Sequence, residues 1–248
     1  MKTNLLRKVA FFMLAAVISY AAGNKAALAY NMLQLDIGGG VYNNVDQTIY
    51  STGDSFTLYA LLDTTKASST DLNATYYIAA AVSPQVSSPS VLGSFIFDNT
   101  TYNVTSDMVY GVPPVELDNT AAFDPCDLPT HGIYETYFRE FKFNFDQNNR
   151  AVAYDSQDDP GGLDSDPNGT FLYASFAVDV SGLSDLYSMH FDLYSEKYKN
   201  GDTDINQKAP FSHDANSGAP VPEPATMLLM GIGLGGLVVA RRRKAGKN

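Results

Sequence analysis

The chain has 248 residues, of which 16 are basic and 27 acidic, and its formal net charge is −11. This acidic excess excludes general binding to nucleic acid, which needs a basic face, and it suits solubility and the binding of cations. The single cysteine, Cys126, cannot form an internal disulfide, so the fold must depend on its hydrophobic core and on any ions that it binds.

The first 29 residues have the pattern of a secretory signal peptide. Basic residues open the chain at Lys2, Arg7 and Lys8, and an apolar stretch follows at 9–22. Ala27 and Ala29 then form the small-residue pattern at which signal peptides are cut. We therefore expect a signal peptide over residues 1–29 and an exported mature protein that begins at Tyr30.

Residues 30–195 predict one all-β domain. Apolar and polar residues alternate in short segments rich in Tyr, Phe, Val and Thr, and the turns between them are rich in Gly, Asn and Asp. This pattern is typical of an antiparallel β-sandwich of the jelly-roll or immunoglobulin-like kind, with about eight to ten strands. The expected strands include 32–37, 55–62, 74–82, 94–97, 102–105, 137–145, 171–180 and 186–194.

Three stretches, 83–90, 112–132 and 157–169, read as long loops, and loops of that length in a compact domain are usually functional or disordered. After residue 195 the chain becomes rich in lysine, asparagine and glycine, which favour a solvated backbone. We expect residues 196–220 to form a polar linker, in which the more apolar 209–214 could dock back onto the domain.

Three segments of the domain, 33–42, 127–134 and 190–194, carry a resemblance to a known group. They resemble the choice-of-anchor proteins of type N, exported bacterial proteins in which a shared extracellular domain is followed by different anchoring tails. The resemblance implies a surface location, brings no known activity and supplies no catalytic residues.

Asp164, Asp166 and Asn168, followed by Gly169, match the opening of a calcium loop. In such a loop the oxygens at alternate positions converge on one point and the glycine permits a sharp turn. The twelfth position is Ser175 where an EF-hand has Glu, so this is not an EF-hand. We predict a calcium site, and the alternative is a solvated acidic turn without metal. Further carboxylates could come from Asp155, Asp158 and Asp159.

The cysteine and the histidines do not by themselves predict a site. Cys126 lies beside Asp124 and Asp127, whose charges raise the pKa of a thiol and disfavour the thiolate. The histidines are too far apart in sequence for a local motif, so they would form a zinc site only if the fold brought them together. They are His131, His190 and His213.

Ser212, His213 and Asp214 have the residue types of a catalytic triad. However, consecutive side chains of an extended chain point apart, so we expect no triad from these three neighbours.

Carbohydrate binding is an alternative function, because sugars stack on exposed aromatic rings and the chain has 16 tyrosines, although it has no tryptophan. Most tyrosines at strand spacing are half-buried core residues. The tyrosines that could be exposed are Tyr76, Tyr77, Tyr134, Tyr137 and Tyr154. A secreted glycan hydrolase is less favoured, because Glu116, Glu135 and Glu140 have no diagnostic context.

The C-terminus has three consecutive parts. A proline-rich box comes first, then an apolar run without charge at 225–240, and then a basic end. The run can partition into lipid as one transmembrane helix, although it is shorter than the roughly 20 residues that usually span a bilayer. The basic end stays cytoplasmic and sets the orientation. The box is Val221, Pro222, Glu223 and Pro224, and the basic end includes Arg241, Arg242 and Arg243.

These three parts, over residues 221–244, resemble the PEP-CTERM sorting signal of Gram-negative bacteria. In that family the membrane-embedded transpeptidase exosortase is thought to cut at the box and to pass the protein to the cell surface or the extracellular polysaccharide. The resemblance implies that the chain is a substrate of exosortase and starts as a precursor anchored in the inner membrane. The alternative is an ordinary single-span anchor that is never cut.

Taken together, these patterns predict an exported, non-enzymatic protein of the cell surface or extracellular matrix. We expect exosortase and extracellular polysaccharide as partners, the membrane before processing, and no nucleic acid. Calcium is the one cofactor that the sequence predicts.

Overall fold

The computed structural model describes residues 31–218 of the chain. No helix within this part is long and apolar enough to cross a membrane. The expected signal peptide with Ala27 and Ala29, the box at 221–224, the transmembrane segment and Arg241, Arg242 and Arg243 all lie outside the described residues.

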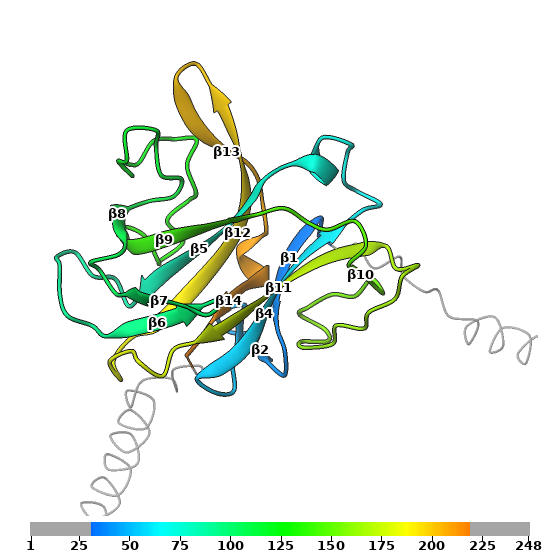
Figure 1. Cartoon of the computed structure of the whole chain (residues 1–248), viewed down its shortest axis with the longest axis horizontal. Helices are drawn as coiled ribbons and strands as arrows, with labels where there is room; N and C mark the ends of the chain where they lie inside the picture. The colour runs from blue at the N-terminus through cyan, green and yellow to red at the C-terminus, as the bar shows by residue number, and fades with distance from the viewer. Residues whose placement is uncertain (1–30, 219–248) are drawn as a thin grey trace, which may run out of the picture. The chain divides into compact units, whose positions relative to one another are not determined.

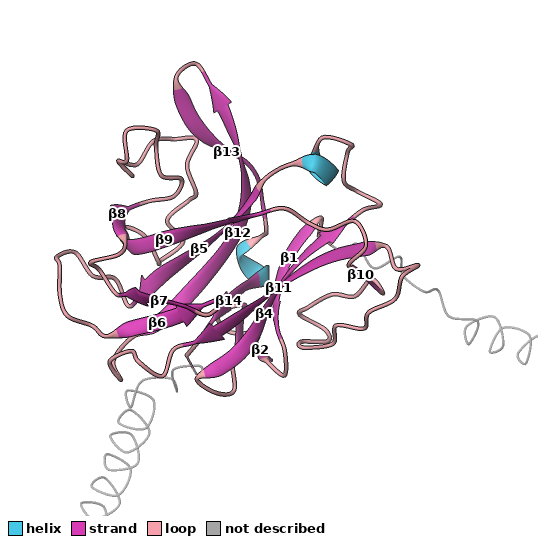
Figure 2. Cartoon of the chain, in the orientation of Figure 1, coloured by secondary structure: helices cyan, strands magenta, loops and turns pink. Residues whose placement is uncertain are grey.

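The described residues form strands and two short 3₁₀ turns (Figure 2). The strands are β1 (Leu33–Ile37), β2 (Val41–Asn43), β3 (Thr48–Tyr50), β4 (Ser55–Asp63), β5 (Tyr76–Ser83), β6 (Ser94–Phe97), β7 (Thr100–Asn103), β8 (Val109–Gly111), β9 (Thr136–Phe143), β10 (Arg150–Ala151), β11 (Phe171–Asp179), β12 (Ser188–Lys199), β13 (Asp202–Lys208) and β14 (Asp214–Asn216). The 3₁₀ turns are η1 (Asp71–Asn73) and η2 (Phe211–His213).

The strands are arranged in two sheets (Figure 1). One has six strands, in the order β1-β4-β11-β6-β7 with β10 beside β11, and the other has eight, in the order β2-β3-β14-β12-β5-β9-β8 with β13 beside β12. The expected all-β class is therefore confirmed. The expectation of antiparallel pairing holds except between β14 and β3, which are parallel. The fourteen strands exceed the expected eight to ten because several are only two to four residues long.

The two sheets share one hydrophobic core, the arrangement of a β-sandwich. Alternate residues of each strand point into it, as the period of two in a strand requires. The six-stranded sheet contributes Leu33, Leu35, Ile37, Leu58, Leu62 and Val178, and the eight-stranded sheet contributes Ile78, Val82, Met189, Phe191, Leu193 and Ala215. Burial of this apolar surface is the main stabilising contribution to the fold.

A second, smaller core lies on the other face of the eight-stranded sheet. Val112, Ala121 and Leu128, from the segment between β8 and β9, pack there with Phe138 and Tyr194 of the sheet. We call residues 112–132 the covering loop, because it buries the outward-facing side chains of β12 and β5. Its first turn is closed where the Val112 amide donates to the Ala121 carbonyl at 3.0 Å.

A different loop covers the outer face of β1. Tyr154 donates its hydroxyl proton to Asp36 at 2.6 Å, and the Gly161 amide donates to the same carboxylate at 2.8 Å. Gln34 accepts from the amide of Ser156 at 3.0 Å. Gln34 and Asp36 are fully buried on β1. These bonds give their side chains the hydrogen-bond partners that buried polar groups need.

The linker expected at 196–220 is wrong for residues 196–218. They form the end of β12, then β13, η2 and β14. β13 pairs only with β12 and extends as a hairpin beyond the rest of the sheet (top of Figure 1), which explains its polar composition. β14 is different, because all three of its residues are buried and it lies between β12 and β3. The domain therefore extends past residue 195 to the end of the described chain.

Candidate metal centre

Three polar side chains meet on the outer face of the eight-stranded sheet, beneath the covering loop. His190 and Asp192 are two residues apart on β12 and therefore point to the same side of the strand. On β14, Asn216 pairs with His190 and Ala215 with Phe191, so the same register sets Asp214 opposite Asp192. The antiparallel pairing of two short sequences thus brings two carboxylates and one imidazole together.

The fourth group comes from the covering loop. His131 has a left-handed backbone conformation, with φ of 34°, which histidine adopts more readily than most residues. Its ring stacks on Phe211 with the ring centroids 3.9 Å apart. Its Nδ1 atom lies 2.6 Å from the carbonyl oxygen of Pro129. Phe211 and Pro129 therefore fix both the plane and the rotation of the imidazole.

The four side chains converge closely. His131 Nε2 lies 3.3 Å from His190 Nε2 and 3.3 Å from Asp192 Oδ1. His190 Nε2 lies 3.5 Å from Asp192 Oδ2 and 3.5 Å from Asp214 Oδ2. One ligand atom can be chosen from each residue so that all four lie within 4.8 Å of one another. We call His131, His190, Asp192 and Asp214 the histidine–aspartate cluster.

The histidine–aspartate cluster is almost closed to solvent. His190 is 2 % exposed, and Asp192 and Asp214 are each 4 % exposed. Tyr134 donates its hydroxyl proton to Asp192 Oδ2 at 2.9 Å. In contrast, Asp214 Oδ1 is buried without a hydrogen-bond partner. A buried carboxylate oxygen without a partner is costly, so this atom needs an explanation.

Burial and mutual charge set the pKa values in the cluster. Burial lowers the pKa of His190, but Asp192 and Asp214 outweigh it, so that this pKa is raised above 6.5. Burial raises the pKa of Asp192, but His190 and His131 outweigh it and hold it below 3.8. Burial raises the pKa of Asp214 to about 7. The two carboxylates thus have opposite shifts within one buried group.

Asp124, Cys126 and Asp204 form a second group that could hold a metal, and it is less enclosed because Cys126 is exposed. The pKa of the Cys126 thiol is raised, as expected, but its largest cause is the charge of Asp204 on β13. The sequence indicated only the flanking aspartates. A raised thiol pKa disfavours the thiolate that binds metals and attacks substrates.

The third histidine, His213, lies outside both groups. Its Nε2 atom is 3.1 Å from Asp155 Oδ1 and its Nδ1 atom is 2.9 Å from Ser212 Oγ. Ser212 reaches the ring because η2 is a 3₁₀ turn and not extended chain. Asp214 points instead into the histidine–aspartate cluster, so the expectation that Ser212, His213 and Asp214 form no triad agrees with their placement.

The turn predicted to bind calcium is held by hydrogen bonds within the turn and to β10. Asp166 Oδ1 accepts the amide proton of Asn168 at 2.9 Å, and the Asp166 amide donates to the Arg150 carbonyl at 3.0 Å. Asp164 and Asn168 are exposed, and Asp166 is half-buried. Neither metal-competent group in the described part of the chain includes Asp155, Asp158, Asp159, Asp164 or Asp166. Calcium binding at this turn stays a prediction.

Gly169 closes a turn, because its amide donates to the Asp166 carbonyl at 2.8 Å, and it also has a packing role that its motif does not predict. A β-carbon on Gly169 would lie 1.9 Å from the carbonyl oxygen of Ala151, so the glycine allows the two backbones to approach closely. This approach joins the end of the acidic turn to β10.

The tyrosines considered for sugar stacking are mostly core residues. Tyr77 is half-buried and its ring stacks on Tyr194 with centroids 6.0 Å apart. The others are buried, so they offer no exposed face to a sugar: Tyr76, Tyr134, Tyr137 and Tyr154. Glu140 is half-buried on β9, where it accepts the Tyr194 hydroxyl proton at 2.5 Å.

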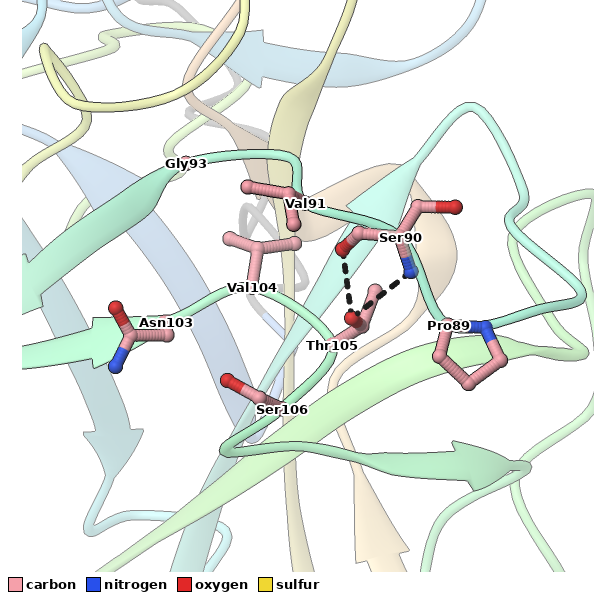
Figure 3. A pocket seen from close by; sticks show the side chains of 8 residues that line it. All are labelled: Pro89, Ser90, Val91, Gly93, Asn103, Val104, Thr105 and Ser106. Atoms are coloured by element: carbon pink, nitrogen blue, oxygen red, sulfur yellow. Dashed lines mark hydrogen bonds between the residues drawn. The ribbon is translucent and has the colours of Figure 1, made fainter.

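A surface pocket of about 550 Å³ lies beside β6 and β7 (Figure 3). Thr105 spans one side of it, because its hydroxyl donates to the Ser90 carbonyl at 2.8 Å and accepts from the Ser90 amide at 3.2 Å. The side chains that line it are small, and none of them is aromatic or charged: Pro89, Ser90, Val91, Gly93, Asn103, Val104, Thr105 and Ser106. Such a lining favours no charged ligand and offers no ring for stacking.

Comparison with known proteins identifies one region of the chain. Residues 220–244 match the PEP-CTERM protein-sorting motif. No curated protein and no solved structure matches the chain. The resemblance of the domain to the choice-of-anchor proteins of type N therefore stays a prediction.

Proposed function

We propose that this chain, which carries the PEP-CTERM protein-sorting motif, is an exported protein with a non-enzymatic structural or adhesive role at the surface or in the extracellular matrix of a Gram-negative bacterium. The observation that carries the proposal is the match of residues 220–244, because a motif of this kind marks a protein as a substrate of exosortase. The sandwich domain is then the part that is delivered.

The position of the motif supports this assignment of roles. β14 ends at Asn216 and the motif begins at Pro220, so only three residues separate the last strand of the domain from the sorting signal. An extended chain spans at most about 3.6 Å per residue. Exosortase would therefore meet the cleavage box close to a folded domain, and not at the end of a long flexible linker.

The charge of the delivered part fits a matrix environment. All 27 acidic residues and only 7 of the 16 basic residues lie between Tyr30 and Pro224, which gives 7 − 27 = −20. A domain with this charge stays soluble and attracts cations that could bridge it to acidic polysaccharide. A sugar-binding role through stacked tyrosines is less favoured, because four of the five tyrosines considered for it are buried.

Processing of the tail tests the proposal. The variant Glu223→Ala and a deletion of residues 241–243 are expected to leave a longer, membrane-bound precursor, because one alters the box and the other removes the charges that set the orientation of the tail. The measurement is an immunoblot of the envelope and the medium. Lys247→Ala is the matched control, since it removes a basic residue beyond the motif. Wild-type processing of the first two variants would show that the motif does not sort this protein.

A further inference from the structure

We propose that the histidine–aspartate cluster is a structural Zn²⁺ site in which His131, His190, Asp192 and Asp214 bind one ion and fasten the covering loop and β14 to β12. The sequence did not indicate this site, because its four residues come from three separate segments. Five properties of the cluster carry the proposal: its spacing, its proton arrangement, its unpaired oxygen, its charge and its position.

The spacing fits a tetrahedral ion. Zinc binds histidine nitrogen and carboxylate oxygen at about 2.0–2.1 Å, so neighbouring ligand atoms of a tetrahedral site lie about 3.3 Å apart. His131 Nε2 lies 3.3 Å from both His190 Nε2 and Asp192 Oδ1, and His190 Nε2 lies 3.5 Å from Asp192 Oδ2 and from Asp214 Oδ2. With one atom taken from each residue, all separations are within 4.8 Å. A hydrogen bond from nitrogen to oxygen is typically about 2.9–3.0 Å long. These contacts are therefore longer than good hydrogen bonds and close to the separation of neighbouring ligand atoms around a shared ion.

The proton arrangement leaves a free lone pair at the centre. Pro129 O can only accept, so the 2.6 Å contact requires His131 Nδ1 to carry the proton and to donate it. The neutral ring then has no proton on Nε2, the atom that faces His190 and Asp192. Metal-binding histidines usually donate their second ring proton to a carbonyl or a carboxylate in this way.

The two carboxylates of the cluster also have the surroundings expected of metal ligands. Tyr134 donates to Asp192 Oδ2 at 2.9 Å and so orients that carboxylate from outside the cluster. Asp214 is 4 % exposed and its Oδ1 atom has no hydrogen-bond partner. A cation bound by this carboxylate would remove the cost of the unpaired oxygen.

The charge balance favours a divalent ion. Two buried carboxylates carry −2 when ionised, and two neutral imidazoles add nothing. In the metal-bound state one divalent cation neutralises this pair. Two nitrogens and two oxygens in a tetrahedron suit zinc, whereas calcium takes six to eight oxygens at about 2.3–2.6 Å. All four ligands come from the protein, which is typical of structural sites and not of catalytic ones.

The position of the cluster explains what an ion would do. It would join the covering loop at His131, β12 at His190 and Asp192, and β14 at Asp214. The chain has one cysteine and cannot form an internal disulfide. A metal cross-link is another way to stabilise an exported domain, because it restricts the unfolded chain and its binding free energy adds to that of folding.

Zinc binding to the full chain, purified in detergent and stripped of metal, tests the proposal. We expect one equivalent of Zn²⁺ to bind in competition with a chromophoric chelator, and to raise the thermal midpoint. Co²⁺ should give the intense visible bands of a tetrahedral site. Asp192→Asn keeps the shape of the side chain and should weaken zinc binding by roughly a hundredfold or more, whereas Tyr134→Phe, which removes only the orienting bond, should weaken it by roughly tenfold.

Asp155→Asn is the matched control, because it also neutralises an aspartate beside a histidine, at His213 and outside the cluster. It should bind zinc as the wild type does. His131→Asn removes the ligand that the covering loop supplies. A substitution in this loop should disturb folding less than one on the central strand β12. The proposal is overturned if the metal-free wild type binds less than one equivalent, or if Asp192→Asn and His131→Asn bind as tightly as Asp155→Asn.

Discussion

Gly111 and Ala121 approach so closely that a β-carbon on Gly111 would lie 1.9 Å from the Ala121 carbonyl oxygen. Gly111 also has φ of 141°, a conformation that other residues rarely adopt. This contact closes the first turn of the covering loop, which carries His131. The placement of one histidine in the cluster therefore depends on a glycine twenty residues earlier in the sequence.

Gly111→Ala is expected to destabilise the domain and to loosen the covering loop. The strained backbone alone should cost roughly 1–3 kcal/mol, and the displaced Ala121 carbonyl adds to this. Urea unfolding measures the change in the free energy of unfolding. Gly53→Ala is the control, because a β-carbon there would have nothing within 4 Å. Equal stability of the two variants would contradict the close approach.

The stability of the metal-free domain should rise as the pH falls from 7 towards 4. Burial raises the pKa of Asp36 from 3.8 to about 6. Its folded form therefore holds a proton more tightly than its unfolded form, and this contribution, present in full below pH 3.8, is lost as the pH rises through about 6. The difference corresponds to roughly 3 kcal/mol. Burial raises the pKa of Asp127 and of Glu196 to about 7, which acts in the same direction.

Thermal midpoints at pH 5, 6 and 7 in the presence of a chelator measure this effect. Asp36→Asn cannot titrate at this position, so it should flatten the pH dependence, while Asp185→Asn, at an exposed site, should leave it unchanged. A midpoint that stays constant or rises with pH in the wild type would disprove the assignment.

Calcium at the turn of residues 164–169 is expected to raise the thermal midpoint of the protein by several degrees at millimolar Ca²⁺. The double variant Asp164→Asn with Asp166→Asn should lose this response, because it removes two carboxylates and keeps an oxygen that can accept the Asn168 amide proton. The measurement is made with the histidine–aspartate cluster saturated by zinc, so that the two sites are separated. Identical melting curves with and without calcium would eliminate this site.

The sequence is most informative where strands are long and amphipathic. A strand was expected at 137–145, and three of its alternate residues, Phe141, Phe143 and Phe145, all pack with the main core. Phe141 stacks on Phe97 with ring centroids 3.8 Å apart. The alternation is readable because one face of β9 is apolar over several residues, and period two is then distinct from any helical period.

Short strands escape this kind of reading. β14 has the sequence Asp-Ala-Asn, which is too short for a period and contains two residues that usually favour turns. Its neighbours β12 and β3 determine its conformation, so residues 196–218 were mistaken for a linker. β13 was missed for another reason. Most of its residues are polar, because a strand of an edge hairpin does not need an apolar face on both sides.

The histidine–aspartate cluster was only partly accessible to sequence reasoning. His190 and Asp192 lie two apart in an alternating segment, so their shared face could have been recognised. His131 is 59 residues from His190, and its approach depends on the path of a loop. Asp214 depends on the pairing of β14 with β12. Neither the path of the loop nor the pairing of β14 with β12 produces a local pattern in the sequence.

The C-terminal strand also determines how the domain would respond to mechanical force. β14 has β12 on one side and β3 on the other, and Ser217 just beyond it bonds to Met189 and to Ser51. A pull transmitted along this strand would load the hydrogen bonds on both sides at the same moment, in shear. Bonds that share a load resist far more than bonds that peel apart singly, so this end of the domain would resist being pulled open.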